Sequence, residues 1–181
     1  MVVCDGIKAH RHQEIQPMKH LILIRHAKSS WDNPGSSDFD RVLNKRGERD
    51  APVMGERLAA LDLDPDVIFS SPAVRAITTA KVVAEKIGYP EEKILTSSDI
   101  YDAETQDLFA VLSRFKDEWN RVIVFGHNPG FTDLANVLGN GTISNVPTCG
   151  VVTLELGIES WEDVRPGCGT IVSFDFPKNV D

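Results

Sequence analysis

The hydrophobic residues of this chain fall into short uninterrupted runs separated by longer amphipathic stretches. The first run is Leu21 to Ile24, and a second of the same kind is Val122 to Phe125. Continuous apolar runs of this length are typical of strands buried on both faces of a sheet. Shorter runs within 66–71 and 93–97 predict two further strands.

Amphipathic helices are predicted between these strands. Apolar residues recur at three- and four-residue intervals from 51 to 61, in a helix that Asn44 would cap and that would end near residue 62. Pro52 falls inside this pattern, where it would either kink the helix or restart it. Further helices are predicted from Pro72 to Gly88, over 108–115 and over 134–138.

The last part of the chain changes pattern. Residues 150–156 and 170–176 are rich in β-branched side chains and have no helical period. They predict a pair of antiparallel strands at one edge of the sheet. Because strand and helix alternate through the first two thirds, we predict an α/β fold: a three-layer α/β/α sandwich with a mostly parallel central sheet and an antiparallel C-terminal edge.

Length and composition indicate one soluble globular domain. The chain has 181 residues, of which 41% are hydrophobic and 25% charged. We expect residues 1–17 to form a poorly ordered extension and residues 18–181 a single domain. The net charge of −8 argues against nucleic acid or a membrane surface as a partner. Three widely spaced cysteines and the lack of a signal or transit peptide predict a cytoplasmic location.

Cationic side chains follow three of the predicted strands. Arg25, His26 and Lys28 come directly after the first strand. Arg75 lies in the opening turn of the helix after the second, and His127 follows the fourth. The carboxyl ends of parallel strands share the edge at which α/β sheets bind ligands, so we expect these side chains to meet. Guanidinium groups pair with phosphate oxygens, and imidazole can attack phosphorus, so the sequence predicts a phosphate pocket.

The motifs around these residues resemble those of the histidine phosphatase superfamily, which is named for an Arg-His-Gly motif after the first strand. Here the motif reads Arg25-His26-Ala27, with alanine in the third position. Within the superfamily, the form RHAKSSW and the compact length resemble the SixA branch of phosphohistidine phosphatases. The resemblance covers most of residues 19–177 and implies a phosphoglycerate mutase-like fold. Its other matching features are Leu43-Asn44 with Gly47, Ser70-Ser71-Pro72 with Arg75 and Thr79-Ala80, Gly126-His127-Asn128, and Pro147-Thr148.

The resemblance also implies catalytic roles. His26 would be the nucleophile that accepts the phosphoryl group, and Arg25, Arg75 and His127 would bind the phosphoryl oxygens. His26 must be neutral to attack, which nearby arginines favour, whereas His127 would benefit from being protonated. Water would then hydrolyse the phosphohistidine, so neither a metal nor a cofactor is expected.

The general acid and the accessory contacts stay open at this point. Asp102 lies after the third strand, where many superfamily members place a carboxylate, and Glu104 is its rival. Either carboxylate could instead cap the next helix, and the SixA branch is generally thought to lack a strong acid there. Lys28, Ser29 and Asn128 are candidate substrate contacts, the alternative being a solvated lysine and two capping residues.

Three functions fit these features. The leading expectation is a metal-independent phosphatase that forms a phosphohistidine intermediate and acts on phosphohistidine proteins. A small-molecule phosphomonoesterase, acting on a sugar or nucleotide phosphate, is the alternative. A non-catalytic phosphate-binding module is a further alternative, although a module of that kind has no need of a nucleophile. The expected partner is accordingly a phosphorylated protein or a small phosphate ester.

Overall fold

Strand β1 (Lys19–Arg25) lies near the middle of a six-stranded sheet in which the strand order is β3-β2-β4-β1-β5-β6. The computed structural model describes residues 18–32, 35 and 37–179, so the predicted extension over residues 1–17 lies outside the described residues. The other strands are β2 (Val67–Ser70), β3 (Leu95–Thr96), β4 (Arg121–Gly126), β5 (Val151–Leu156) and β6 (Gly169–Asp175).

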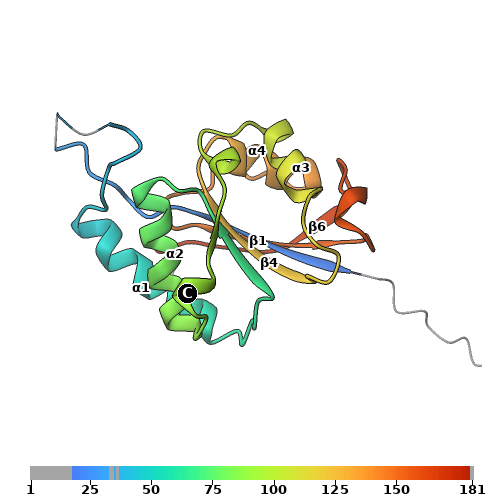
Figure 1. Cartoon of the computed structure of the whole chain (residues 1–181), viewed down its shortest axis with the longest axis horizontal. Coiled ribbons are helices and arrows are strands. Elements are labelled where there is room, and N and C mark those ends of the chain that lie inside the picture. The colour runs from blue at the N-terminus through green and yellow to red at the C-terminus, as the bar shows by residue number, and fades with distance from the viewer. Residues whose placement is uncertain (1–17, 33–34, 36, 180–181) are drawn as a thin grey trace, which may run out of the picture.

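Helices cover both faces of the sheet, which confirms the predicted three-layer α/β/α sandwich (Figure 1). The helices are α1 (Lys45–Ala59), α2 (Val74–Ile87), α3 (Thr105–Leu112) and α4 (Gly130–Leu138), with short 3-10 turns η1 (Glu91–Lys93), η2 (Ser98–Ile100) and η3 (Trp161–Asp163). Successive side chains of β1 point to opposite faces. Ile22 and Ile24 pack in the α1 and α2 layer, whereas Leu21 and Leu23 pack in the α3 and α4 layer.

The pairing of the strands agrees with the predicted topology. Strand β4 pairs in parallel with both β1 and β2, and β2 pairs in parallel with β3. Strands β5 and β6 run antiparallel and extend the sheet beyond β1, as the change of pattern near residue 150 predicted. Among the described residues, no helix is long and apolar enough to cross a membrane.

Three local predictions need correction. The first helix runs without interruption through Pro52 and ends at Ala59 rather than near residue 62. The third strand is only two residues long, because β3 lies at the edge of the sheet and pairs with β2 over two residue pairs. Helix α3 ends at Leu112, before Phe115. The predicted caps are confirmed: the side chain of Asn44 accepts hydrogen bonds at the start of α1, and Gly88 ends α2 in the left-handed conformation.

Candidate active site

The three central parallel strands end side by side. Arg25 at the end of β1 pairs with Gly126 of β4, and Ser70 at the end of β2 pairs with Phe125. The residues that follow these ends therefore come together at one edge of the sheet. A cavity of about 290 Å³ opens there. It is lined by all the predicted site residues and by several others: Arg25, His26, Lys28, Ser29, Trp31, Asp38, Arg41, Arg75, Tyr101, Asp102, His127, Asn128 and Thr148.

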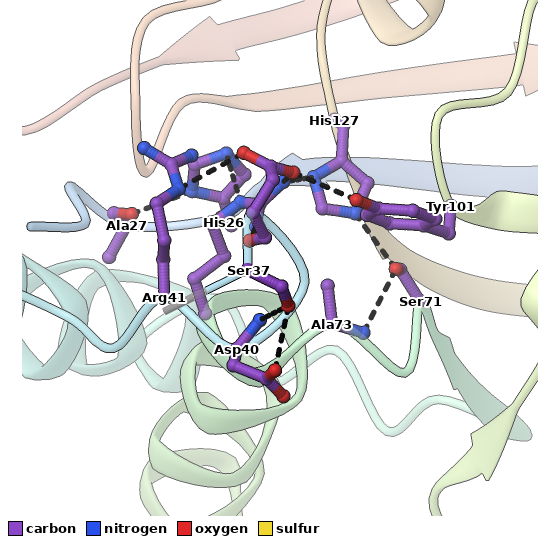
Figure 2. Close-up of polar contacts among 11 residues, drawn as sticks. His26, Ala27, Ser37, Asp40, Arg41, Ser71, Ala73, Tyr101 and His127 are labelled. Carbon is purple, nitrogen blue, oxygen red and sulfur yellow. Dashed lines mark hydrogen bonds and ion pairs between the residues drawn. The ribbon is translucent and has the colours of Figure 1, made fainter. Parts of the chain in front are cut away.

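His26 is buried and its tautomer follows from its two contacts. Its Nδ1 lies 2.7 Å from the carbonyl oxygen of Ala27, so Nδ1 carries the proton and donates it (Figure 2). The Nε of Arg75 donates to Nε2 at 3.3 Å, so Nε2 carries the lone pair. Burial lowers the pKa of His26 to about 3; the bond to Ala27 opposes this shift, and the charges of neighbouring arginines add to it. The imidazole is therefore neutral at pH 7.

His127 is also buried, with its ring centroid 5.2 Å from that of His26. Its Nε2 lies 2.8 Å from the hydroxyl of Ser71, and its Nδ1 lies 3.3 Å from Nη2 of Arg75. Figure 2 shows the hydrogen bonds that join His127, Ser71 and Ala73. Burial, with the charge of Arg75, lowers the pKa of His127 to about 4. The benefit of protonation that we expected for His127 is therefore not met in the ligand-free protein, where this imidazole is neutral.

Arg75 lies between the two histidines because Pro72 ends β2 and the first turn of α2 begins at the edge of the sheet. Its guanidinium is buried and contacts the Nε2 of His26 and the Nδ1 of His127. On its other side, Nη1 donates to the main-chain oxygen of Asp38 at 2.5 Å, and Nη2 donates to the Asp38 carboxylate at 3.0 Å. Arg75 is thus held on two sides.

Arg25 reaches the cavity from the end of β1. Its Nη1 donates to the main-chain oxygen of Val146 at 2.8 Å, and its buried Nε has no hydrogen-bond partner among the residues that the structure describes. Asn128 donates to the same Val146 oxygen at 3.0 Å and to Asn145 at 2.9 Å, while its buried Oδ1 accepts no hydrogen bond from the described part of the chain. These two side chains therefore bring one donor and one acceptor that are unused in the ligand-free protein.

The other two candidate contacts differ from each other. The side chain of Lys28 is exposed on the cavity wall, whereas Ser29 is buried and forms an isolated bridge with Leu43. The main-chain oxygen of Lys28 accepts a hydrogen bond from Asn44 at 3.0 Å, and a Cβ added to Gly47 would lie 2.2 Å from that oxygen. The motif Leu43-Asn44 with Gly47 therefore fixes the chain that follows His26.

The two candidate acids have separate places. Asp102 is exposed, lines the cavity and has a positive φ of 51°. Glu104 caps α3, where its side chain and that of Asp107 form a reciprocal capping box. Glu104 is not among the residues that line the cavity, so Asp102 is the carboxylate of this pair that can reach a bound phosphoryl group.

Five residues of the cavity wall were not among the candidate site residues: Trp31, Asp38, Arg41, Tyr101 and Thr148. Asp38 joins most of them, because the Tyr101 hydroxyl donates to its Oδ2 at 2.9 Å and Arg41 lies 3.1 Å from its Oδ1. Burial alone would raise the pKa of the Asp38 carboxyl, but the Tyr101 hydrogen bond and the Arg75 charge outweigh it and hold the pKa below its usual value. The guanidinium of Arg41 lies 3.6 Å from the ring centroid of Trp31. Tyr101 directly precedes Asp102, so the search after the third strand could have included it.

The main chain of a cysteine, Cys149, hydrogen-bonds to the residues at the end of β1. The main-chain N–H of Cys149 lies 3.1 Å from the carbonyl oxygens of both Arg25 and His26. Cys149 has a positive φ of 64° and is completely buried, and burial raises the pKa of its thiol to about 12. Among the described residues, no group of three or more His, Cys, Asp or Glu side chains is arranged to hold a metal ion.

The chain is similar to several known proteins. The model of the histidine phosphatase superfamily (branch 1) matches residues 21–128. The uncharacterized protein Rv1276c of Mycobacterium tuberculosis is 32% identical over 165 residues, which cover 86% of this chain and 100% of that protein. A proposed phosphohistidine phosphatase SixA from Agrobacterium tumefaciens has a TM-score of 0.71 and 26% identity, with 87% of this chain and 97% of that chain covered.

A further solved structure, the protein histidine phosphatase SixA complexed with tungstate, superposes with a TM-score of 0.76 at 21% identity, covering 90% of this chain and 99% of that chain. Its likeness concerns the fold, and it agrees with the resemblance that the RHAKSSW motif indicated. The family match spans the first four strands and both histidines of the cavity. This chain therefore belongs to the histidine phosphatase superfamily and has a SixA-like fold.

Proposed function

We propose that this protein is a metal-independent phosphatase that removes the phosphoryl group from phosphohistidine on a protein substrate, with His26 as its nucleophile. The observation that carries the proposal is the state of His26. Its Nδ1–H is bound by the oxygen of Ala27, so the unprotonated Nε2 is fixed beside Arg75 in the cavity. A neutral imidazole with an oriented lone pair is the form of histidine that can attack phosphorus.

The reaction takes two displacements. The Nε2 of His26 attacks phosphorus, and the bond from phosphorus to the leaving nitrogen of the substrate breaks, with the proton for that nitrogen coming from solvent or Asp102. Water then attacks the phosphorus of phospho-His26, the Nε2–P bond breaks, and inorganic phosphate leaves. Arg25 and Arg75 stabilise the negative charge on the phosphoryl oxygens in both transition states. A bound dianion also raises the pKa of His127 and so allows it to donate a hydrogen bond.

Two features favour phosphohistidine over an alkyl phosphate. Asp102 is exposed, so its carboxyl is not held firmly in position to protonate a leaving group. An imidazole leaving group needs such a proton less than an alkoxide does. The cavity, at about 290 Å³, is slightly smaller than the roughly 300–1,000 Å³ that pockets for small molecules enclose. A phosphorylated side chain that reaches in from a protein surface needs little more than that space.

Steady-state hydrolysis in the presence of EDTA tests the proposal, with a phosphohistidine protein offered beside a panel of small phosphate esters. We expect the phosphohistidine protein to be preferred and an acid-labile phosphoenzyme to be trapped in the wild type but not in His26→Asn. His20, at the opposite end of β1, provides the matched control, and His20→Asn should keep its activity. Preference for one small ester would overturn the proposal that the substrate is a phosphohistidine protein. Turnover by His26→Asn within tenfold of the wild type would overturn the assignment of His26 as the nucleophile.

A further inference from the structure

The guanidinium of Arg75 offers two separate pairs of N–H donors, and the protein uses them differently. The pair formed by Nε and one Nη2 hydrogen faces His26 and His127, at 3.3 Å in each case. The pair formed by Nη1 and the other Nη2 hydrogen faces Asp38, whose main-chain oxygen and Oδ2 lie at 2.5 and 3.0 Å. A phosphoryl group on His26 Nε2 would therefore meet the first pair, and Asp38 holds the second.

From this geometry, and on the basis of the proposed function, we propose that Asp38 is a positioning residue that aims the phosphate-binding face of Arg75. Its carboxylate acts on the far side of the guanidinium from the reacting atoms. It therefore does not compete with a phosphoryl group for the donors that face the two histidines. The role is distinct from that of Asp102, which lines the same cavity without a hydrogen bond to Arg75 among the described residues.

Asp38 can serve as an anchor because it is itself held in place. The hydroxyl of Tyr101 donates to Oδ2 at 2.9 Å, and the Nε of Arg41 lies 3.1 Å from Oδ1. Arg41 is in turn stacked on Trp31. Although 45% of the Asp38 side chain is exposed, these contacts restrict its rotation from two directions. An exposed carboxylate with one long flexible partner would give little orientation, whereas a carboxylate fixed by a second chain segment can orient a buried arginine.

The surroundings of Arg75 explain why such an anchor is needed. Its side chain is only 6% exposed, and the charge of Arg75 lowers the pKa of Arg41, so a second guanidinium acts on the same part of the cavity. A buried cation without a paired anion is unfavourable and turns toward any acceptor within reach. Without the Asp38 carboxylate, Nη2 of Arg75 loses its anionic partner, and the acceptors left to the guanidinium are the main-chain oxygen of residue 38 and the nitrogen lone pairs of His26 and His127. A closer approach to Nε2 of His26 would tie up the lone pair that has to attack.

A double-mutant cycle tests this role, with two readouts. We would measure kcat/KM on the best substrate, and the Kd for tungstate by calorimetry, for wild type, Asp38→Ala, Arg75→Ala and the double variant. Asp38→Ala should reduce kcat/KM and weaken tungstate binding by about 10- to 100-fold, as the loss of an orienting partner does at other sites. In the Arg75→Ala background the same change should alter tungstate binding by less than about twofold, because its effect passes through Arg75.

Two further variants separate positioning from folding. Asp38→Asn restores a side-chain oxygen that can accept from Nη2 of Arg75, whereas the main-chain oxygen is present in every variant, so Asp38→Asn should recover most of the tungstate affinity that Asp38→Ala loses. Asp40→Ala removes a carboxylate from the same loop that bonds to Ser37 (Figure 2) and should bind tungstate as the wild type does. An equal loss in the wild-type and Arg75→Ala backgrounds would overturn the proposal, as would a wild-type affinity in Asp38→Ala. Because tungstate binding is measured without turnover, failure of the proposed phosphatase activity would be seen separately.

Discussion

The neutrality of the buried histidines should make the protein less stable in mild acid, by an amount that can be worked out for His127. Its pKa is lowered to about 4, whereas an exposed imidazole titrates near 6.5. Between these values the unfolded chain takes up a proton that the native protein does not. Stability is therefore unaffected above about pH 7.5 and falls as the pH drops through 6.5, until the native histidine is also protonated near pH 4.

The size of the loss follows from the two pKa values. At pH 5.0 an unfolded imidazole is almost fully protonated and the native one is not, which corresponds to a loss of about 2 kcal/mol relative to pH 8.0. His127 is 7% exposed, so solvent screening reduces this figure little. His26, with a pKa of about 3, should add a similar loss over the same range.

His127→Gln isolates this contribution, because the amide can still donate to the hydroxyl of Ser71 but cannot titrate. We would measure urea unfolding at pH 8.0 and 5.0 and extrapolate the free energy of unfolding to water. The wild type should lose about 2 kcal/mol more than the variant between the two pH values, since all other titrating groups are shared. An equal loss in both proteins would refute the view that His127 is held neutral by burial.

Three other outcomes are expected. Because a bound dianion raises the pKa of His127, tungstate binding should take up protons between pH 5 and 7 and weaken as the pH rises; calorimetry in buffers of different ionisation enthalpy would detect this, and no uptake would contradict it. Asp102→Asn should reduce hydrolysis of alkyl phosphates at least about tenfold more than that of p-nitrophenyl phosphate, whose leaving group needs no proton; equal losses would count against an acid role. Gly47→Ala should lower the free energy of unfolding by about 1–3 kcal/mol, because its Cβ would meet the main-chain oxygen of Lys28, whereas Gly157→Ala, with its nearest neighbour at 3.8 Å, should unfold like the wild type.

Much of the fold could be predicted because its signals are local. The apolar runs that became β1 and β4 are buried on both faces, and such a run has few alternatives to a central strand. The same logic brought Arg25, His26, Arg75 and His127 to one edge, since each follows a strand or opens the next helix. Their meeting in one cavity needed only the parallel topology, which the alternation of strands and helices predicts.

The parts that were missed depend on contacts between distant segments. Asp38 and Arg41 lie in a polar loop whose composition predicts only a covering segment, and nothing nearby in the sequence pairs Asp38 with Arg75 or Tyr101. The third strand was predicted too long because the length of an edge strand depends on how many residues of its neighbour pair with it, and β2 pairs with β3 over only two residues. The neutral state of His127 in the ligand-free protein could not be predicted for a related reason: the cost of burying a charged imidazole depends on how completely the surrounding chain excludes water, which a short sequence motif does not reveal.

The position of Cys149 has a consequence for chemistry under oxidative conditions. Phosphatases that use a cysteine nucleophile depend on a thiolate, and a thiolate is the species that peroxide and electrophiles attack. Here the thiol of Cys149, whose main chain contacts His26, is fully buried and its pKa is about 12, so it carries no thiolate at neutral pH. Only its main-chain N–H supports the end of β1. On the proposed mechanism, in which His26 is the nucleophile, phosphoryl transfer should therefore continue at peroxide concentrations that inactivate phosphatases with a cysteine nucleophile.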